Sequence, residues 1–183
     1  MYSDICEKRI CQGDILENFI YDLNIPLSAE IKKIRMSFPY VIVLSQDCDL
    51  TRDYEIRFTE KEKKNYANQL FTVLICPLFN AEIFREGNHL SDINIQCDRY
   101  NSERWQPVKN NENPRLHFLS KNEELAFPDL ILDFKYFYTF PIEAMYEIKE
   151  KIFKAKVADL YKESVSQRFS NYLARVALPD QEA

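Results

Sequence analysis

One segment of the chain, YVIVLSQDCDL at residues 40–50, limits the choice of fold most strongly. Its residues 41–44 (VIVL) are apolar in succession, although neighbouring side chains of a β-strand point to opposite faces of a sheet. Such a run predicts a strand that is covered on both faces. Residues 70–79 (LFTVLICPLF) predict a second strand of this kind, which we expect to stop near Pro77 because proline cannot donate to a β-ladder.

The first third of the chain carries weaker patterns. Residues 10–19 indicate a Gly-Asp turn at 13–14 beside a short strand. A polar connection then leads into the strand at 41–44, and the charged residues 60–69 are compatible with a short surface helix. The apolar anchors of the first strand are Ile15 and Phe19.

The remaining residues predict a helical segment, further strands and a closing helix. Residues 80–114 indicate two short helices across a loop that is broken at Gly87. Residues 127–140 are rich in aromatic and β-branched side chains and predict one or two strands. Residues 158–176 predict a helix with one apolar face. The residues of that face are Leu160, Val165, Phe169, Tyr172, Leu173 and Val176.

Short strands separated by turns favour a small, strongly bent barrel over a doubly wound parallel sheet. We therefore predict an α+β fold: a small β-barrel with a helical insertion at about 80–114 and a C-terminal helix. A chain of 183 residues fits one domain, which we place at 1–179. Residues 180–183 are expected to be a tail or the start of a linker.

Composition excludes several classes of function. The chain contains two glycines, so neither a G-x-G-x-x-G loop nor a Walker A loop can be written. A net charge of −5 argues against a protein that mainly tracks a nucleic-acid backbone. Because no apolar run approaches the ~20 residues of a membrane helix, we expect no membrane contact.

The cysteines and histidines indicate a reduced, cytoplasmic protein. Five cysteines without framework spacing do not suggest disulfides. No C-x-x-C occurs, and His89 and His117 are the only histidines, so a zinc site is a poor match. The same scarcity of histidine makes a Cys-His or Ser-His catalytic pair improbable.

Three short motifs follow one another along the chain: QGDIL at 12–16, FPYVIVLSQD at 38–47 and FTVLIC at 71–76. In this order, with a helix at the end, they resemble the PemK/MazF toxin family of small SH3-like barrels. QGDIL is similar to the opening R-G-D-hydrophobic strand of that family, and FPYVIVLSQD to its R-P-hydrophobic strand. The resemblance covers about half of the chain and implies an SH3-like β-barrel of PemK/MazF type.

Two positions depart from the ribonucleases of this family. Phe38 stands where they carry an arginine, and Cys76 stands where they carry threonine or serine. Cleavage of RNA through its 2′-hydroxyl needs a general acid or base and a cation beside the phosphate, and phenylalanine supplies neither. Cys76 is expected to be an inert core thiol. No catalytic residue is therefore expected; if the chain is active, Cys76 and Asp47 are the candidates.

For function, the resemblance implies a non-catalytic, protein-binding regulatory module in bacterial stress or antiviral defence signalling. MazF-like regulators that sequester a sigma factor in CRISPR-linked protease systems are a precedent. The expected partner is a protein, RNA is less favoured, and no cofactor is expected. Two alternatives stay open: an endoribonuclease toxin of MazF type that uses non-standard residues, and an enzyme that depends on a divalent metal.

The stretch Asp47-Cys48-Asp49 allows three interpretations. The two carboxylates, with Asp14 as the obvious third ligand, could hold a divalent cation. Cys48 could be a nucleophile, but the neighbouring carboxylates would raise its thiol pKa. Ser45, Asp47 and Asp49 could instead accept backbone N–H bonds in a turn after the strand. We favour this structural role, so no metal is expected here.

Five other residues are candidates for partner contacts: Arg168, Arg175, Trp105, Tyr136 and Tyr138. The two arginines lie seven residues apart and project similarly from the closing helix, so they could bind an anion, although solvated arginines are the simpler interpretation. Trp105 could stack on a base, but a single tryptophan in a polar segment is more often an anchor. The two tyrosines share one face of their strand and could form part of a protein contact.

Overall fold

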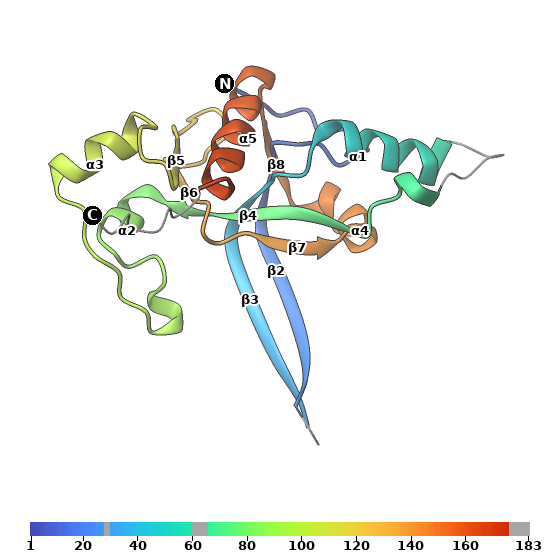
Figure 1. The fold of residues 1–183 in the computed structure, drawn as a ribbon, viewed down its shortest axis with the longest axis horizontal. Helices are drawn as coiled ribbons and strands as arrows, with labels where there is room; N and C mark the ends of the chain where they lie inside the picture. Colours follow the sequence, from blue (N-terminus) through green and yellow to red (C-terminus); the bar gives the residue numbers. More distant parts are fainter. Residues whose placement is uncertain (28–29, 60–65, 176–183) are drawn as a thin grey trace, which may run out of the picture.

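The eight strands of the described residues form one antiparallel sheet, which curls into a half-barrel (Figure 1). The structure is a computed structural model that describes residues 1–27, 30–59 and 66–175. The strands lie in the order β1-β8-β2-β3-β4-β6-β5, and β7 pairs with another stretch of β4. Their bounds are β1 (Tyr2–Ser3), β2 (Asp14–Leu27), β3 (Glu30–Val43), β4 (Thr72–Asn80), β5 (Leu116–Leu119), β6 (Leu130–Asp133), β7 (Tyr138–Pro141) and β8 (Phe153–Val157).

Helices pack on the sheet and complete a mixed α+β fold, which confirms the predicted class. The α-helices are α1 (Asp47–Tyr54), α2 (Ala81–Arg85), α3 (Ser102–Lys109), α4 (Ile142–Ile152) and α5 (Asp159–Leu173). A π-helical turn, η1 (Glu55–Thr59), extends α1, and two 3₁₀ turns are η2 (Tyr66–Asn68) and η3 (Ser91–Ile93). Elements α2, η3 and α3 fall in the segment expected to be a helical insertion, about 80–114.

The apolar run at 41–44 is covered on both faces, as predicted. Ile42 and Leu44 belong to a core cluster that includes Phe169 of α5. Val41 and Val43 belong to a second cluster, on the opposite face, that includes Met145 of α4. Because side chains alternate along this segment, its residues contribute to two separate core clusters.

A third core cluster lies under the helices of the 80–114 segment. It joins Phe84 of α2 and Trp105 of α3 to Leu116 and Ile131 of the neighbouring strands. Trp105 is therefore a buried anchor of α3, in agreement with the favoured interpretation of this residue. The strands predicted within 127–140 are present as β6 and β7.

Strands β2 and β3 form a long hairpin that projects from the body of the protein (Figure 1). Their pairing runs from Ile15–Ile42 to Leu27–Glu30, so the expected short strand and polar connection are one continuous ribbon. The sequence pattern missed this because polar and apolar residues alternate along both strands, and the charges at 30–35 obscure that alternation. We call residues 20–27 and 30–37 the β-arm.

The prediction that β4 stops near Pro77 was wrong, because the strand continues through it to Asn80. Pro77 is opposite Val41 of β3. On the other edge of β4, pairing with β7 ends at Ile75 and pairing with β6 begins at Leu78. Pro77 lies in the gap between these two partners, where no neighbouring strand needs an N–H from it.

The short surface helix expected at 60–69 is tested only at its end. Residues 60–65 lie outside the described residues, and Tyr66–Asn68 forms a 3₁₀ turn. A helix that the sequence did not predict, α1, begins earlier, at Asp47. It was missed because its N-cap residue, Gln46, makes no side-chain capping bond and is not one of the usual capping residues.

The closing helix packs on the sheet through fewer residues than the sequence suggests. Val165 and Phe169 are buried, whereas Leu160 is 80% exposed and Leu173 is 53% exposed. Leu160 is five residues before Val165, which turns it away from the buried face of a helix with 3.6 residues per turn. Val176, the last residue of the expected stripe, and residues 180–183 lie outside the described residues.

Two substitutions on α5 test this assignment. We expect Phe169→Ala to lower the free energy of unfolding by about 3–5 kcal/mol, because it empties a large site in the core. The matched control, Leu160→Ala, should change it by less than about 0.5 kcal/mol, as for an exposed side chain. Urea unfolding followed by circular dichroism measures both values. Equal losses for the two variants would contradict the packing of α5 described here.

Candidate functional site

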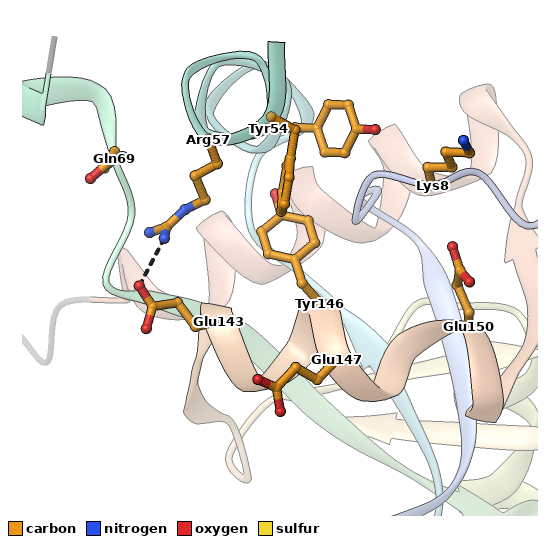
Figure 2. Close-up of a pocket in the computed structure, with 9 residues that line it drawn as sticks. Lys8, Tyr54, Arg57, Gln69, Glu143, Tyr146, Glu147 and Glu150 are labelled. Atoms are coloured by element: carbon orange, nitrogen blue, oxygen red, sulfur yellow. Dashed lines mark hydrogen bonds and ion pairs between the residues drawn. The ribbon is translucent and has the colours of Figure 1, made fainter. Parts of the chain in front are cut away.

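Two of the hollows in the described surface lie at the two ends of α1. The α1–α4 groove, about 610 Å³ in volume, lies at the end of α1 and beside α4 (Figure 2). The α1–α5 groove, about 660 Å³ in volume, lies between the start of α1 and α5. The second groove is our candidate functional site because residues of all three sequence motifs, QGDIL, FPYVIVLSQD and FTVLIC, and the closing helix meet there.

The α1–α5 groove has an apolar floor and a polar rim. The floor consists of Leu44, Leu70, Leu74, Phe169 and Leu173. The rim carries Gln12, Asp47, Cys48, Asp49, Lys162, Glu163, Ser166 and Ser170. Gln12 joins the N-terminal loop to the segment after β3 and to α5, since its amide donates to the carbonyl of Leu44 and to the hydroxyl of Ser166 at 3.2 and 2.6 Å.

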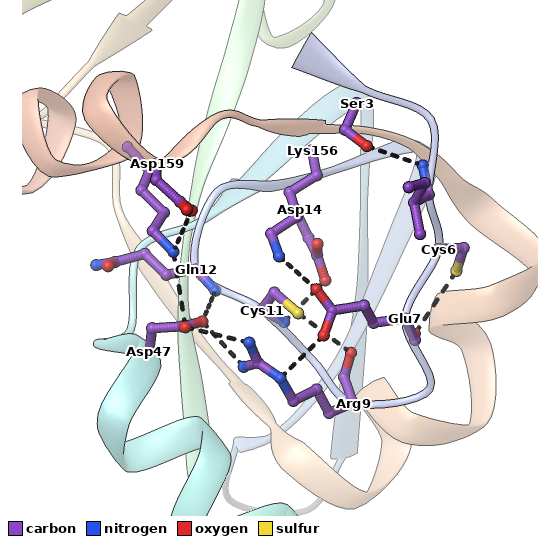
Figure 3. Close-up of polar contacts among 12 residues, drawn as sticks. Ser3, Cys6, Glu7, Arg9, Cys11, Gln12, Asp14, Asp47, Lys156 and Asp159 are labelled. Atoms are coloured by element: carbon purple, nitrogen blue, oxygen red, sulfur yellow. Dashed lines mark hydrogen bonds and ion pairs between the residues drawn. The ribbon is translucent and has the colours of Figure 1, made fainter. Parts of the chain in front are cut away.

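A bidentate ion pair fixes the start of α1 to the N-terminal loop (Figure 3). The two terminal nitrogens of Arg9 donate to both carboxylate oxygens of Asp47, at 3.0 and 3.1 Å. The backbone N–H of Gln12 donates to the same carboxylate at 3.1 Å, and Lys162 of α5 lies 3.6 Å from it. Partial burial would raise the pKa of Asp47, but the bonds from Arg9 and Gln12 outweigh it and hold that pKa below its ordinary value.

A buried lysine holds the same N-terminal loop from beneath. Lys149 of α4 is only 1% exposed, and its ammonium donates to the backbone carbonyls of Glu7 and Arg9. It also lies 3.4 Å from a carboxylate oxygen of Asp14, which is equally buried. That oxygen accepts the backbone N–H of Cys11 at 2.9 Å. Burial raises the pKa of Asp14, and the neighbouring Lys149 opposes this only in part.

The Asp47-Cys48-Asp49 stretch opens a helix and does not form the expected turn. Both aspartates lie in the first turn of α1, where negative charge is favourable. The backbone bonds expected here exist only in part: Ser45 accepts the N–H of Leu74 at 2.8 Å, and Asp47 accepts its backbone bond from distant Gln12. The strand ends at Val43, so strand alternation does not govern these side chains.

The alternative metal site does not form in the part of the chain that the structure describes. Asp14 faces buried Lys149, Asp47 binds Arg9, and Asp49 is exposed at the groove. Within residues 1–27, 30–59 and 66–175, no three His, Cys, Asp or Glu side chains are grouped so that they could hold a metal ion.

The residues considered for catalysis are engaged in the fold. Cys76 is fully buried and its thiol contacts the carbonyls of Asp133 and Tyr136, at 3.4 and 3.5 Å. Burial raises the pKa of this thiol, which disfavours the thiolate. Phe38 packs against Tyr138, with ring centroids 5.5 Å apart.

The structure spreads the residues proposed for partner contacts over several places, and it brings none of them into the α1–α5 groove. Arg168 was expected on a free surface, but its guanidinium donates to backbone carbonyls of the loop after α3 and to the carbonyl of Leu116, the first residue of β5, at 2.9 Å. Arg175 is exposed and lies over the ring of Tyr172. Tyr136 lies beside Arg115 and Lys135, whereas Tyr138 contacts Phe38.

Sequence reasoning missed a cysteine–histidine contact in the 80–114 segment. The thiol of Cys97 lies 3.8 Å from a ring nitrogen of His89, which stacks on Phe84. Gly87 permits this close return of the chain, because a Cβ there would meet the carbonyl oxygen of Cys97 at 2.2 Å. Burial lowers the pKa of His89, which favours the neutral ring. In the sequence, Gly87 was the available signal for this contact, because glycine tolerates a close approach of another part of the backbone.

Sequence reasoning also missed the link between α1 and α4. Asp53 is fully buried and accepts bonds from Arg57, from the hydroxyl of Tyr146 and from the backbone N–H of Leu70. Arg57 then reaches Glu143 of α4 at 3.0 Å (Figure 2). The C-terminal end of α1 is thus attached to α4, and its N-terminal end is attached to the N-terminal loop.

Comparison of the chain with protein-family models, with curated proteins and with solved structures finds no match. Among the described residues, no helix combines the length and the apolar character needed to cross a membrane.

The ion pair of Asp47 predicts a specific pH dependence. Asp47→Asn should lower the free energy of unfolding by about 1–2 kcal/mol at pH 7, because a charge-assisted bidentate bond is lost. Since the folded-state pKa of Asp47 lies below its ordinary value of 3.8, its contribution is complete above about pH 5 and declines as the pH falls further. The difference between wild type and variant should therefore shrink between pH 7 and pH 3.5 in urea unfolding.

Asp49→Asn is the matched control, because Asp49 lies in the same helical turn and makes no ion pair with any described residue. Its effect on the free energy of unfolding should be smaller than that of Asp47→Asn, because no ion pair is lost. An Asp47→Asn effect that is equally large at both pH values would show that Asp47 stabilises the fold by some means other than its charge.

Proposed function

We propose that this chain is a non-catalytic, protein-binding module that regulates another protein, and that the α1–α5 groove is its binding site. One observation carries this proposal: the groove combines an apolar floor with two exposed rim carboxylates, Asp49 and Glu163, that make no ion pair with described residues. Apolar surface surrounded by unpaired polar groups is typical of a site for a protein segment.

The chemistry of the rim defines the expected partner segment. Asp47 and Lys162, the other charged residues of the rim, are already paired, to Arg9 and to Asp159. The unpaired charge at the groove is therefore negative. A partner segment with apolar side chains for the floor and lysine or arginine for the rim would complement it.

The architecture supports a relation to the SH3-like barrels of PemK/MazF type. An antiparallel sheet that curls, three motifs in the order of that family and a helix that closes the sheet are all features of this chain. From the resemblance to that family we further propose a role in bacterial stress or antiviral defence signalling in the cytoplasm, where sequestration of a sigma-factor-like partner is one form that the regulation would take.

The positions that a MazF-type ribonuclease would use favour binding over RNA cleavage. A cation is needed beside the scissile phosphate, and Phe38 at that position packs in an aromatic contact. Cys76 is a buried thiol with a raised pKa, and Asp47 is bound by Arg9. We therefore propose that the fold has kept a groove for a partner while these positions serve its stability.

Affinity capture from the organism that encodes the chain tests this proposal. The wild-type protein should retain a protein whose apolar and basic segment, made as a synthetic peptide, binds in titration calorimetry. The double variant Asp49→Lys/Glu163→Lys should bind that peptide at least tenfold more weakly, because the rim then repels it. Glu103→Lys/Glu124→Lys, which reverses two exposed carboxylates outside the groove, should bind as the wild type does.

A second arm of the test addresses the ribonuclease alternative. Incubation with a long single-stranded RNA, with a chelator and then with Mg²⁺, should leave the RNA intact. Cleavage that is lost in Cys76→Ala or in Asp47→Asn would overturn the proposal in favour of a nuclease. Equal peptide affinity of the two double variants would remove the α1–α5 groove as the binding site.

A further inference from the structure

The β-arm has one largely apolar face and one mixed face. Tyr21 and Leu23 of β2 are directly opposite Met36 and Ile34 of β3, so these four side chains share one face. On the opposite face Asp22 pairs with Arg35 at 2.7 Å and Asn24 is opposite Lys33, and the exposed side chains of Ile20 and Ile31 lie among these polar residues. An isolated two-stranded ribbon is marginally stable in water, so the apolar face calls for a cover.

The described part of this chain covers only the base of that face. Tyr21 contacts Phe140, with ring centroids 5.3 Å apart, and Phe38 at the base contacts Tyr138. Leu23, Ile34 and Met36 belong to none of the three core clusters. The arm projects away from the helices that cover the rest of the sheet (Figure 1).

The α1–α4 groove offers a surface of matching chemistry. Three aromatic rings contact one another there: Phe58 lies 5.0 Å from both Tyr54 and Tyr146, centroid to centroid. Phe58 is 59% exposed, so much of its apolar surface is accessible at the groove. Glu147 and Glu150 also line this groove, on α4, and both are exposed carboxylates that make no ion pair with any described residue (Figure 2).

The arm carries the complementary charges. Lys32 lies on the apolar face, two residues from Ile34 toward the end of the hairpin, and Lys33 is its neighbour on the mixed face. Both lysines are exposed and make no ion pair with any described residue. The arm thus presents an apolar face that ends in cations. The groove presents aromatic rings beside the carboxylates of Glu147 and Glu150, with one exposed cation, Lys8, at its border.

We propose that the β-arm of one copy of this chain docks in the α1–α4 groove of a second copy, with the end of the arm that carries Lys32 and Lys33 beside Glu147 and Glu150 and with Lys32 on the docking face. The occupant is a second copy because one chain carries both complementary surfaces, and its own arm points away from its own groove (Figure 1). Aromatic rings against aliphatic side chains supply the contact area, and the charges set the register. This contact leaves the α1–α5 groove free.

Sedimentation velocity on charge-reversed variants tests the contact. Wild type should self-associate. Lys32→Glu/Lys33→Glu, the arm variant, and Glu147→Lys/Glu150→Lys, the groove variant, should each sediment as monomers. An equimolar mixture of the two variants should associate again, because a glutamate arm then meets a lysine groove while the unchanged arm meets the unchanged groove. Circular dichroism must show that each variant is folded.

Several results would overturn the proposal. Wild type that remains monomeric up to its solubility limit contradicts it directly. Self-association of the groove variant alone would show that the arms pair with each other or with another surface. A mixture that stays monomeric would show that the four charges do not face one another. Glu103→Lys/Glu124→Lys, as the control for net charge, should associate as the wild type does.

Discussion

The buried ammonium group of Lys149 is the constraint on which the rest of the structure depends. A charge that is 1% exposed costs several kcal/mol unless hydrogen bonds and a counter-charge satisfy it. Lys149 obtains them from the carbonyls of Glu7 and Arg9 and from the carboxylate of Asp14. The N-terminal loop therefore closes over α4, where its Ile10 also enters the core cluster that contains Met145.

Closure of that loop shapes the candidate site. Lys149 binds the backbone carbonyl of Arg9 and so positions this residue. The guanidinium of Arg9 can then bind Asp47, the first residue of α1. Lys162 of α5 approaches the same carboxylate, so loop, α1 and α5 meet at one anion. At the other end of α1, buried Asp53 accepts a hydrogen bond from Tyr146 and so attaches this helix to α4. Both grooves are thus bordered by helices whose positions depend on ionic contacts.

Sequence patterns predict the core well and the site poorly, for a physical reason. The run at 41–44 and the burial of Phe169 follow from periodicity, because apolar side chains separate by face wherever they occur. The pair Arg9–Asp47 joins residues 38 apart, and Lys149 reaches a carbonyl 142 residues away. No local pattern marks such contacts. The QGD and Asp-Cys-Asp motifs belong to segments that contact each other in the structure. Neither motif indicated that its carboxylates are bound by cations.

Amide hydrogen exchange in Lys149→Met tests the role of this lysine most directly. The N–H groups of Cys11 and Gln12 donate to Asp14 and Asp47, so we predict that both lose protection when Lys149 is removed, while Ile75 in β4 keeps it. Lys151→Met, which changes an exposed lysine of the same helix, should leave all three amides as in wild type. Unchanged protection of Cys11 and Gln12 in Lys149→Met would contradict the view that the buried ammonium group holds the loop and, through it, the groove.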